Sequence, residues 1–474
     1  MACAGKALPD LPPDEYVNIE NNHPDLVPLS VQHIASGFDM LDDDSIYLIL
    51  IALCYTDVIQ RLKQLWPLSL TCKRLRALCL PLMFKRVVWP NKHIPNVNDD
   101  VPMLPETLWP YIQYVGVSST SLRKPSLIPP TFDRNFRYHY SDDDYIDELI
   151  YAIPRLPRLY TFSVHTLITP PDELIEALFH CPTLVNLSFE ETPLNFHLPR
   201  TPCKSLHTLR FLDGRDLRVS GGPRLFIRSW RESPGREIYE KIENERRPSD
   251  TLATTQILRI HSPFLQHLEL ASGLTSVRGL VAVTWPLLQT LTLTGPSPLD
   301  GEPILQIIQA MPALRELRIL YSVFSSRDTV RWCVYPSIPV GGMTKTFPLT
   351  LTACSPNLRS LTLSNPRPTD MAFQSIPRTL ESLTLPSIYE WPHFTKGLDH
   401  AFAIRIVRDV SACGARLREL RIFVNSEPNV DLVNTIVESF PALETLHLGV
   451  DVWPRRAKQD IDISYLASNQ MLLL

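Results

Sequence analysis

The chain of 474 residues lacks the features that mark membrane-spanning, secreted or metal-binding proteins. Its longest apolar stretch, IYLILIALCY at 46–55, is too short to span a bilayer. The first residues contain no apolar run typical of a signal peptide. The nine cysteines include no C-x-x-C pair and no spacing typical of zinc ligands. We therefore expect reduced thiols, an intracellular location in the cytoplasm or nucleus, and no membrane partner.

Catalytic motifs and a strong net charge are also missing. The sequence has no P-loop, no G-x-G-x-x-G, no H-E-x-x-H and no G-x-S-x-G motif. A net charge of −4 is small for this length and gives no general attraction to nucleic acid. The acidic run SDDDYIDELI at 141–150 does not match a calcium-binding loop and is more simply explained as the start of a helix. We expect a non-enzymatic protein with no cofactor, no metal ion and no nucleic-acid partner.

Proline, in contrast, is abundant, and a recurring phrase accounts for much of it. There are 44 prolines, over 9% of the chain, against about 5% in an average protein. MPALRELRIL at 311–320 and FPALETLHLG at 440–449 share apolar residues at positions 0, +3 and +5, counted from the first leucine, with a proline two residues before it. Copies of this phrase start at Ile112, Leu159, Leu184, Leu206, Leu265, Leu288, Leu314, Leu358, Leu380, Leu417 and Leu443.

This spacing predicts a short strand in every copy. Positions +3 and +5 lie on one face of a strand, and the mostly polar positions +2 and +4 lie on the other. Helix-like spacing follows at 170–181, 300–311 and 430–440, and proline ends each helix before the next strand. Cysteines just ahead of the strands are expected to be buried and inert, namely Cys181, Cys203, Cys354 and Cys413.

The region at about 105–450 resembles the leucine-rich repeat family. Six of the ten intervals between copies are 22 to 26 residues, within the range of about 20–29 for such repeats. The match covers only the L-x-x-L-x-L core, because Thr192, Gly214 and Ser322 stand where the family has asparagine or cysteine. We expect an α/β leucine-rich-repeat solenoid over 91–474, with parallel strands on the concave face, helices outside, and insertions at about 118–140, 213–250 and 325–348.

Residues 28–90 have no such phrase and predict a bundle of three short helices. Asp42, Asp43 and Asp44 precede an apolar run and suit a helix start, because carboxylates cap free N–H groups. A second stripe at helical spacing is expected to end near Pro81, with Lys73, Arg74 and Arg76 facing solvent. Its apolar members are Leu68, Cys72, Leu75, Cys79 and Leu82.

This helical segment resembles an F-box. The match includes Leu41, Asp44, Ile46, Ile49, Leu50, Leu68, Leu70, Cys72, Lys73, Leu75 and Ala77. Two features depart from the family: Asp42 replaces its proline, and the stretch 54–66 is longer than usual. The resemblance implies a substrate-recognition subunit that docks on a Skp-type adaptor and, through it, a cullin-type (SCF) ubiquitin ligase. The implied adaptor-binding residues are Leu41, Asp44, Ile46, Ile49, Leu50, Leu68, Leu70, Lys73 and Leu75.

The alternative is a leucine-rich-repeat interaction scaffold without a ubiquitin link, in which 28–90 only caps the first repeat. In both cases residues 1–27 are expected to be a flexible N-terminal segment, and the repeats to bind an unknown target protein. Polar positions of the strands then offer candidate target-binding residues, namely Arg210, His267, Glu269, Arg318, Arg421, Phe423 and His447. The same side chains also fit an ordinary solvated sheet face.

The insertion at 213–250 provides one more candidate, Trp230, which lies beside Arg228 and Arg231. An exposed tryptophan between arginines is typical of an interface anchor. The alternative is a mobile surface loop with a short exposed helix in GREIYEKIENERR at 235–247.

Overall fold

The computed structural model divides the chain into two compact units, residues 1–83 and 84–474. Within them it describes residues 41–53, 58–89, 105–118, 142–165, 169–190, 192–194, 196, 201–212, 250–271, 274, 277–296, 304–322, 350–366, 372–388 and 397–450. The predicted N-terminal segment at 1–27, almost all of the three predicted insertions, and Trp230 lie outside these residues.

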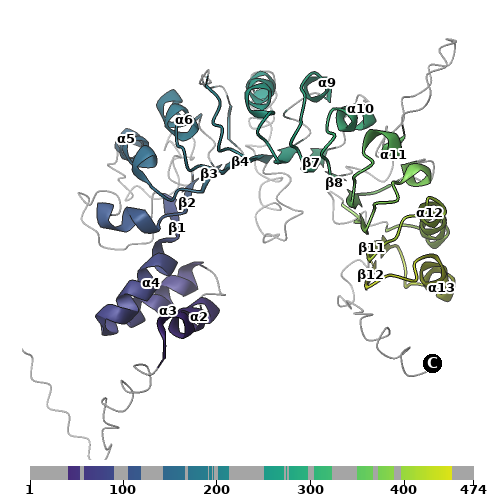
Figure 1. Ribbon diagram of the computed structural model, residues 1–474, viewed down its shortest axis with the longest axis horizontal. Coiled ribbons are helices and arrows are strands. Elements are labelled where there is room, and N and C mark those ends of the chain that lie inside the picture. The colour runs from purple at the N-terminus through teal and green to yellow at the C-terminus, as the bar shows by residue number, and fades with distance from the viewer. Residues whose placement is uncertain are drawn as a thin grey trace, which may run out of the picture. The chain divides into compact units, whose positions relative to one another are not determined.

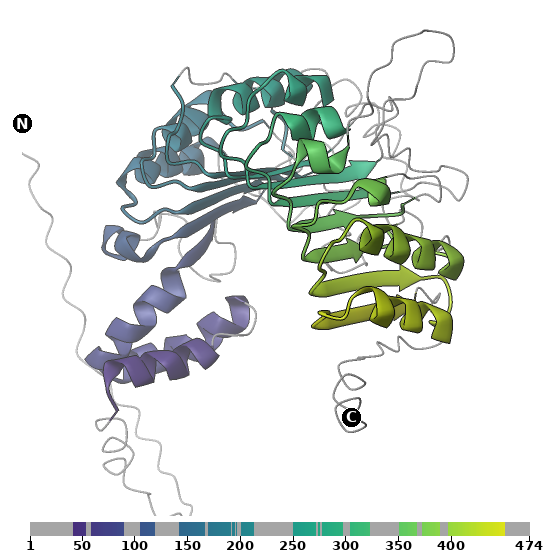
Figure 2. The ribbon, with the colours of Figure 1, turned by 45° about the vertical axis from the view of Figure 1, so that its right-hand side comes forward.

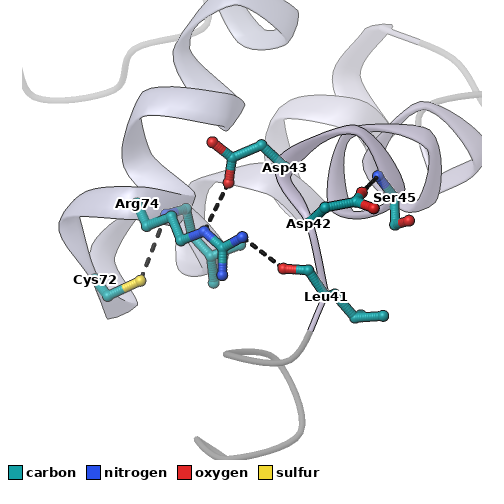
Figure 3. A network of polar contacts seen from close by, with 7 residues as sticks. Leu41, Asp42, Asp43, Ser45, Cys72 and Arg74 are labelled. Carbon is teal, nitrogen blue, oxygen red and sulfur yellow. Dashed lines mark hydrogen bonds and ion pairs between the residues drawn. The ribbon is translucent and has the colours of Figure 1, made fainter.

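The described residues of the first unit form three helices, α2 (Asp43–Leu53), α3 (Val58–Thr71) and α4 (Lys73–Phe84). Helix α2 starts as predicted, because the carboxylate of Asp42 accepts a hydrogen bond from the Ser45 N–H at 2.6 Å. Arg74, at the start of α4, donates to Asp43 Oδ1 at 2.7 Å and to the Leu41 carbonyl at 2.5 Å (Figure 3). These contacts join the first turns of α2 and α4.

Three details of the predicted second stripe are wrong. Helix α3 ends at Thr71 and α4 begins at Lys73, so Cys72 lies between the two helices. Cys72 is exposed, and its sulfur accepts a hydrogen bond from the Leu75 N–H at 3.4 Å (Figure 3). Helix α4 also continues through Pro81 to Phe84. Arg74 does not simply face solvent, since it is held by Asp43 and Leu41. Cys79 and Leu82 are buried as expected.

The second unit is built on one parallel sheet whose twelve strands follow the chain order from β1 to β12 (Figure 1). All eleven phrases form strands, and each strand begins two residues after position 0. The additional strand, β1, precedes them. The strands are β1 (Arg86–Trp89), β2 (Tyr114–Ser118), β3 (Thr161–His165), β4 (Asn186–Glu190), β5 (Thr208–Leu212), β6 (His267–Ala271), β7 (Thr290–Pro296), β8 (Glu316–Ser322), β9 (Ser360–Leu363), β10 (Ser382–Leu385), β11 (Glu419–Val424) and β12 (Thr445–Val450).

Helical segments connect the strands and lie on one side of the sheet (Figures 1 and 2). The predicted helices at 170–181, 300–311 and 430–440 correspond to α6, α10 and α13, and the acidic run at 141–150 begins α5. The helical elements are η1 (Glu106–Tyr111), α5 (Asp142–Ala152), η4 (Ile153–Arg155), α6 (Asp172–Phe179), a helix at 250–261, α9 (Val277–Val281), α10 (Ile304–Gln309), α11 (Leu351–Cys354), η6 (Ala372–Ser375), α12 (His400–Ala412) and α13 (Val430–Ser439).

The core of this unit is a set of apolar rows that run from strand to strand. Parallel pairing keeps equivalent positions in register, so Leu291, Leu317 and Leu361 are neighbours at position +3 of β7, β8 and β9. Position 0 is fully buried from Leu159 to Leu417. Each strand therefore hides its apolar face only because the coils before and after it are present.

Proline occupies a specific place in this geometry. The carbonyls of Cys181, Met311 and Phe440 accept hydrogen bonds from the N–H of the leucine three residues later, at 3.4, 3.1 and 3.1 Å. The residue that follows each of these carbonyls is proline, the second residue of the four-residue turn that leads into the strand. Proline suits this site because its φ is preset for that turn position and it has no N–H to satisfy.

Polar side chains at the strand exits replace the asparagine of regular leucine-rich repeats. The buried Thr192 hydroxyl donates to the Val164 carbonyl at 2.9 Å, and Ser364 donates to the Tyr321 carbonyl at 2.7 Å. Asn365, with a φ of 45°, bonds the Tyr321 and Ile388 carbonyls at 3.2 and 2.6 Å. Backbone groups at the turns are thus satisfied by different residues in different coils.

His261 fills a similar structural role inside the core, where it is only 1% exposed. Its Nε2 accepts from the Cys203 N–H at 3.2 Å, so the ring proton lies on Nδ1 and is donated to the Ile257 carbonyl at 3.0 Å. The ring stacks on that of Phe179, with 4.7 Å between the ring centroids. Burial lowers the pKa of His261, because a second ring proton would be desolvated and would face the Cys203 N–H.

The predicted cysteine environment is confirmed in the described coils, where Cys181, Cys203 and Cys354 are buried and Cys413 is partly buried. Burial also raises the pKa of the Cys354 thiol, which keeps it protonated. The last described coil is less completely buried than those before it. Leu443 and Leu446 of β12 are only partly buried, since no further described strand follows.

Leucines at the same repeat position should therefore differ in their contribution to stability. Leu358→Ala, in a fully buried site, should reduce the free energy of unfolding by about 2–5 kcal/mol. Leu443→Ala removes the same atoms from a partly exposed site and should cost less than half as much. Urea denaturation of both variants measures the difference, and equal losses would show that the last coil is as well packed as the middle of the sheet.

Acid should weaken this unit through His261. The unfolded chain binds a proton at this residue below about pH 6.5, whereas the folded chain resists protonation. Stability should consequently fall as the pH decreases from about 6.5, by up to ~1.4 kcal/mol per pH unit from this histidine. His261→Gln should be less stable near neutral pH but should have a shallower decline between about pH 6.5 and 5.

Chemical denaturation at several pH values measures that slope. His180→Gln, at an exposed position, is the matched control and should keep the wild-type slope. An unchanged slope in His261→Gln would contradict the assignment.

Candidate interaction surface on the sheet

The candidate surface is the face of the sheet opposite the helices, which we call the open face. It is formed by positions +2, +4 and +6 of the strands, because alternate side chains of a strand point to opposite sides. On β11, Leu420, Ile422 and Val424 are buried, whereas Arg421 and Phe423 are exposed. In-register pairing places the equivalent residues of successive strands side by side.

The predicted target-binding residues in the described strands all lie on the open face. Arg210 belongs to β5, His267 and Glu269 to β6, Arg318 to β8, Arg421 and Phe423 to β11, and His447 to β12. The register pairs Arg210 with Glu269, and Arg421 with His447. These residues form two groups, on β5–β6 and on β11–β12, and Arg318 lies between them.

Each of the predicted arginines on the open face is hydrogen-bonded to a glutamate carboxylate. Arg210 Nε donates to Glu269 Oε2 on the neighbouring strand at 2.6 Å. Arg318 and Arg421 each bond the glutamate two residues earlier in their own strand, Glu316 and Glu419, with Nε–Oε1 distances of 2.6 Å. A guanidinium has five N–H donors, so each arginine keeps donors for a partner while its position is fixed.

The last two of these pairs come from an identical sequence, LRELRI, at 314–319 and 417–422. The strands that contain them, β8 and β11, flank β9 and β10. On the open face β9 and β10 present only small hydroxyl side chains, from Ser360, Thr362, Ser382 and Thr384. The result is a strip of short polar side chains with a glutamate–arginine pair on each side.

Phe423 provides an apolar contact point next to this strip. It is 38% exposed and pairs in register with Gly449 on β12. A Cβ atom at position 449 would lie 2.5 Å from the Phe423 ring, so glycine is what lets the ring lie over β12. An exposed aromatic ring beside an arginine is typical of interface anchors.

A second charged pair at the other end of the sheet was missed from the sequence. His165 on β3 and Glu190 on β4 are register partners, with 3.7 Å between Nδ1 and Oε2. The contact with His165 is the main cause that keeps the pKa of Glu190 below its ordinary value, and Ser188 adds a hydrogen bond at 3.3 Å. Both residues occupy position +6, as Phe423 does, so the same strand position predicted them although they were not singled out.

Arg86 of β1 and Tyr114 of β2 add a cation–π contact on this face, 4.6 Å from the guanidinium carbon to the ring centroid.

Within the described parts of the chain, no group of three or more histidine, cysteine or acidic side chains is arranged to hold a metal ion. The helices described there include none that is long and apolar enough to cross a membrane.

The sheet and its outer helices define the fold class as an α/β solenoid of the leucine-rich-repeat type. No protein family and no curated protein matches the sequence. Among solved structures, the chain is similar to the leucine-rich repeat-containing protein LegL7 from Legionella pneumophila, with 13% identity and a TM-score of 0.36. That similarity covers 67% of this chain and 92% of the other.

The His165–Glu190 contact makes a specific prediction about ionisation. His165→Ala should raise the pKa of Glu190, because it removes the main interaction that favours the carboxylate and leaves the opposing effect of burial in place. The stability that this carboxylate contributes is present above its ordinary pKa of about 4.5 and is lost as the pH falls through the lowered value, so the variant should lose it at higher pH.

NMR titration of protein labelled at the glutamate carboxyl carbons measures this pKa directly. His447→Ala, on the distant strand β12, is the control and should leave the Glu190 titration unchanged. A Glu190 pKa that does not respond to His165→Ala would show that the hydroxyl groups dominate.

Proposed function

We propose that this protein is a non-catalytic substrate-recognition subunit of a cullin-type ubiquitin ligase. In this proposal the helical unit docks on a Skp-type adaptor, and the open face of the repeat sheet binds the target protein. The observation that carries the first part is an apolar surface on helices α2 and α3. The resemblance of residues 41–77 to an F-box gives that surface its proposed partner.

The exposed apolar side chains of this unit are arranged as pairs one helical turn apart. On α2, Ile49 and Leu53 are 44% and 41% exposed, and on α3, Trp66 and Leu70 are 55% and 67% exposed. Residues four apart share a helix face, so each helix presents a continuous apolar stripe. Leu48 is also exposed, at 65%. Such exposed clusters are typical of sites that another protein covers.

Burial divides the residues that the F-box resemblance assigns to adaptor binding. Ile46 and Leu50 are buried and hold the helical unit together, whereas Ile49, Leu70, Asp44 and Lys73 are exposed. The remaining three, Leu41, Leu68 and Leu75, are partly buried. The proposed contact surface therefore consists of the exposed members together with Leu48, Leu53 and Trp66.

The repeat unit suits the recognition of a protein target. Its open face combines oriented glutamate–arginine pairs, small hydroxyl groups and the exposed Phe423 ring. Ionic and hydrogen-bonding groups supply specificity, and an exposed aromatic side chain supplies binding energy.

One observation favours the alternative of a leucine-rich-repeat scaffold without a ubiquitin link. Helix α4 ends at Phe84, and only Lys85 separates it from β1, which pairs with the first repeat strand β2. Solenoids need a terminal segment that covers the open end of their core. A helical segment joined so directly to the first strand suits that role as well as adaptor docking.

Co-purification of the full-length chain with a Skp-type adaptor distinguishes these functions. Ile49→Asp combined with Leu70→Asp places two charges in the apolar stripes, and both substituted side chains are exposed. We expect this variant to remain folded and to lose adaptor binding by at least about tenfold, because each charge would be desolvated at the interface.

Val430→Asp combined with Val437→Asp is the matched control. These valines are 72% and 51% exposed on α13 of the repeat unit, and the change adds the same charge. The control should bind the adaptor normally. If the wild-type chain does not bind the adaptor, or if the helical variant binds as well as the control, the scaffold without a ubiquitin link is the better description.

A further inference from the structure

A row of five arginines lies outside the open face, in the turns that lead into strands β8 to β11. Position +1 of the phrase is Arg315 before β8, Arg359 before β9 and Arg418 before β11. Arg378 stands two residues before position 0 in the β10 coil, where most copies have proline. Arg416 lies one residue before position 0 in the next coil. These five side chains are all exposed at the amino-terminal ends of the strands.

Three of these arginines line a cleft of about 400 Å³ between the turns of the β10, β11 and β12 coils. Its charged walls are Arg378, Arg416 and Arg418 together with Glu381 and Glu444. The Arg378 side chain lies alongside Gly414, where a Cβ atom would be 3.5 Å from its Nε. Gly414 has a φ of 76°, a conformation that glycine adopts without strain, so the turn that supports Arg378 depends on this residue.

The carboxylates of the cleft are already neutralised. Arg418 donates to Glu444 Oε1 from Nε at 2.8 Å and from Nη2 at 2.5 Å, and this contact raises the pKa of Arg418. Glu381 lies 3.8 Å from Arg359. Within the described coils, Arg378 and Arg416 have no carboxylate partner. Five arginines against two glutamates leave this edge with a net charge of +3.

We propose that this edge is a second interaction surface, which binds an acidic segment of a partner protein in the cleft between the β10 and β12 turns. The two unpaired guanidiniums bind carboxylates through paired N–H donors, and Arg315 and Arg359 extend the positive row to the neighbouring coils. Adjacent strands are about 4.8 Å apart, so an extended peptide crossing the coils meets a new turn every one to two residues.

A row of charges fits several carboxylates along a peptide better than one isolated anion. The surface lies at the end of the strands and uses positions −2, −1 and +1, so it is separate from the open face. It also needs no adaptor binding by the helical unit, and the proposal can hold or fail independently of the ubiquitin-ligase function.

The test measures binding of a labelled peptide of alternating glutamate and glycine to the full-length chain by fluorescence anisotropy at low ionic strength. Arg378→Gln combined with Arg416→Gln should weaken binding by at least about tenfold, because both free guanidiniums are removed. Added salt should weaken wild-type binding, since the contacts are exposed. The same peptide with glutamine in place of glutamate should not bind.

Arg405→Gln combined with Arg408→Gln is the matched control. Both of these arginines are exposed on α12, and the change removes the same two charges away from the cleft. Binding within about twofold of wild type in this control supports the cleft. Equal losses in the two double variants would overturn the proposal and indicate a general charge effect.

Absence of wild-type binding would also overturn it. So would binding that requires phosphoserine in place of glutamate, because the site would then select phosphate rather than an acidic segment. Unfolding midpoints of both double variants should match that of wild type, since all four arginines are exposed.

Discussion

The repeat unit depends on in-register stacking of incomplete apolar faces. A single strand with leucines at 0, +3 and +5 has nothing to bury them against, and the parallel neighbour with the same pattern supplies the missing contacts. The row of fully buried position 0 leucines from Leu159 to Leu417 is the direct result. The partly exposed Leu443 and Leu446 show the same constraint at the last described strand, where only one neighbour is present.

Register also decides what lies on the other face. Because the strands do not slip, a polar residue at +2 or +4 in one coil always meets its counterpart in the next, and ion pairs such as Arg210–Glu269 form across strands. The turns follow from the same register. Proline or arginine two residues before the first leucine sits at the strand entrance, and this is how Arg378 reaches the cleft beside Arg416 and Arg418.

The two units divide the physical tasks of the chain. The helical unit has few buried side chains and exposes apolar stripes, whereas the repeat unit has a long core and exposes charged and hydroxyl groups. Apolar stripes suit a permanent helical partner, and polar faces suit selection among different targets. The proposed function assigns the first kind of surface to a common adaptor and the second to a specific target.

Most of the strands could be read from the sequence, because their signal is local and repeated. The +3/+5 spacing located eleven strands, and the aspartates at 42–44 located the start of α2. The break at Cys72 and the continuation of α4 past Pro81 were not predicted, since proline and helical spacing alone do not show where neighbouring helices end. In the candidate site, the residue types and the face that they occupy could be read from the sequence.

Only the tertiary structure decided which polar and charged groups are in contact. His261 and Cys203 are 58 residues apart, yet the ring of one satisfies the N–H of the other. The pairing of Arg418 with Glu444, and the absence of a carboxylate partner for Arg378 and Arg416 in the described coils, depend on distances between turns that no local pattern encodes. The sequence by itself determined the repeating strand and its two faces, because alternation is a property of each strand. The contacts between coils were decided by packing, because they join residues far apart in the chain.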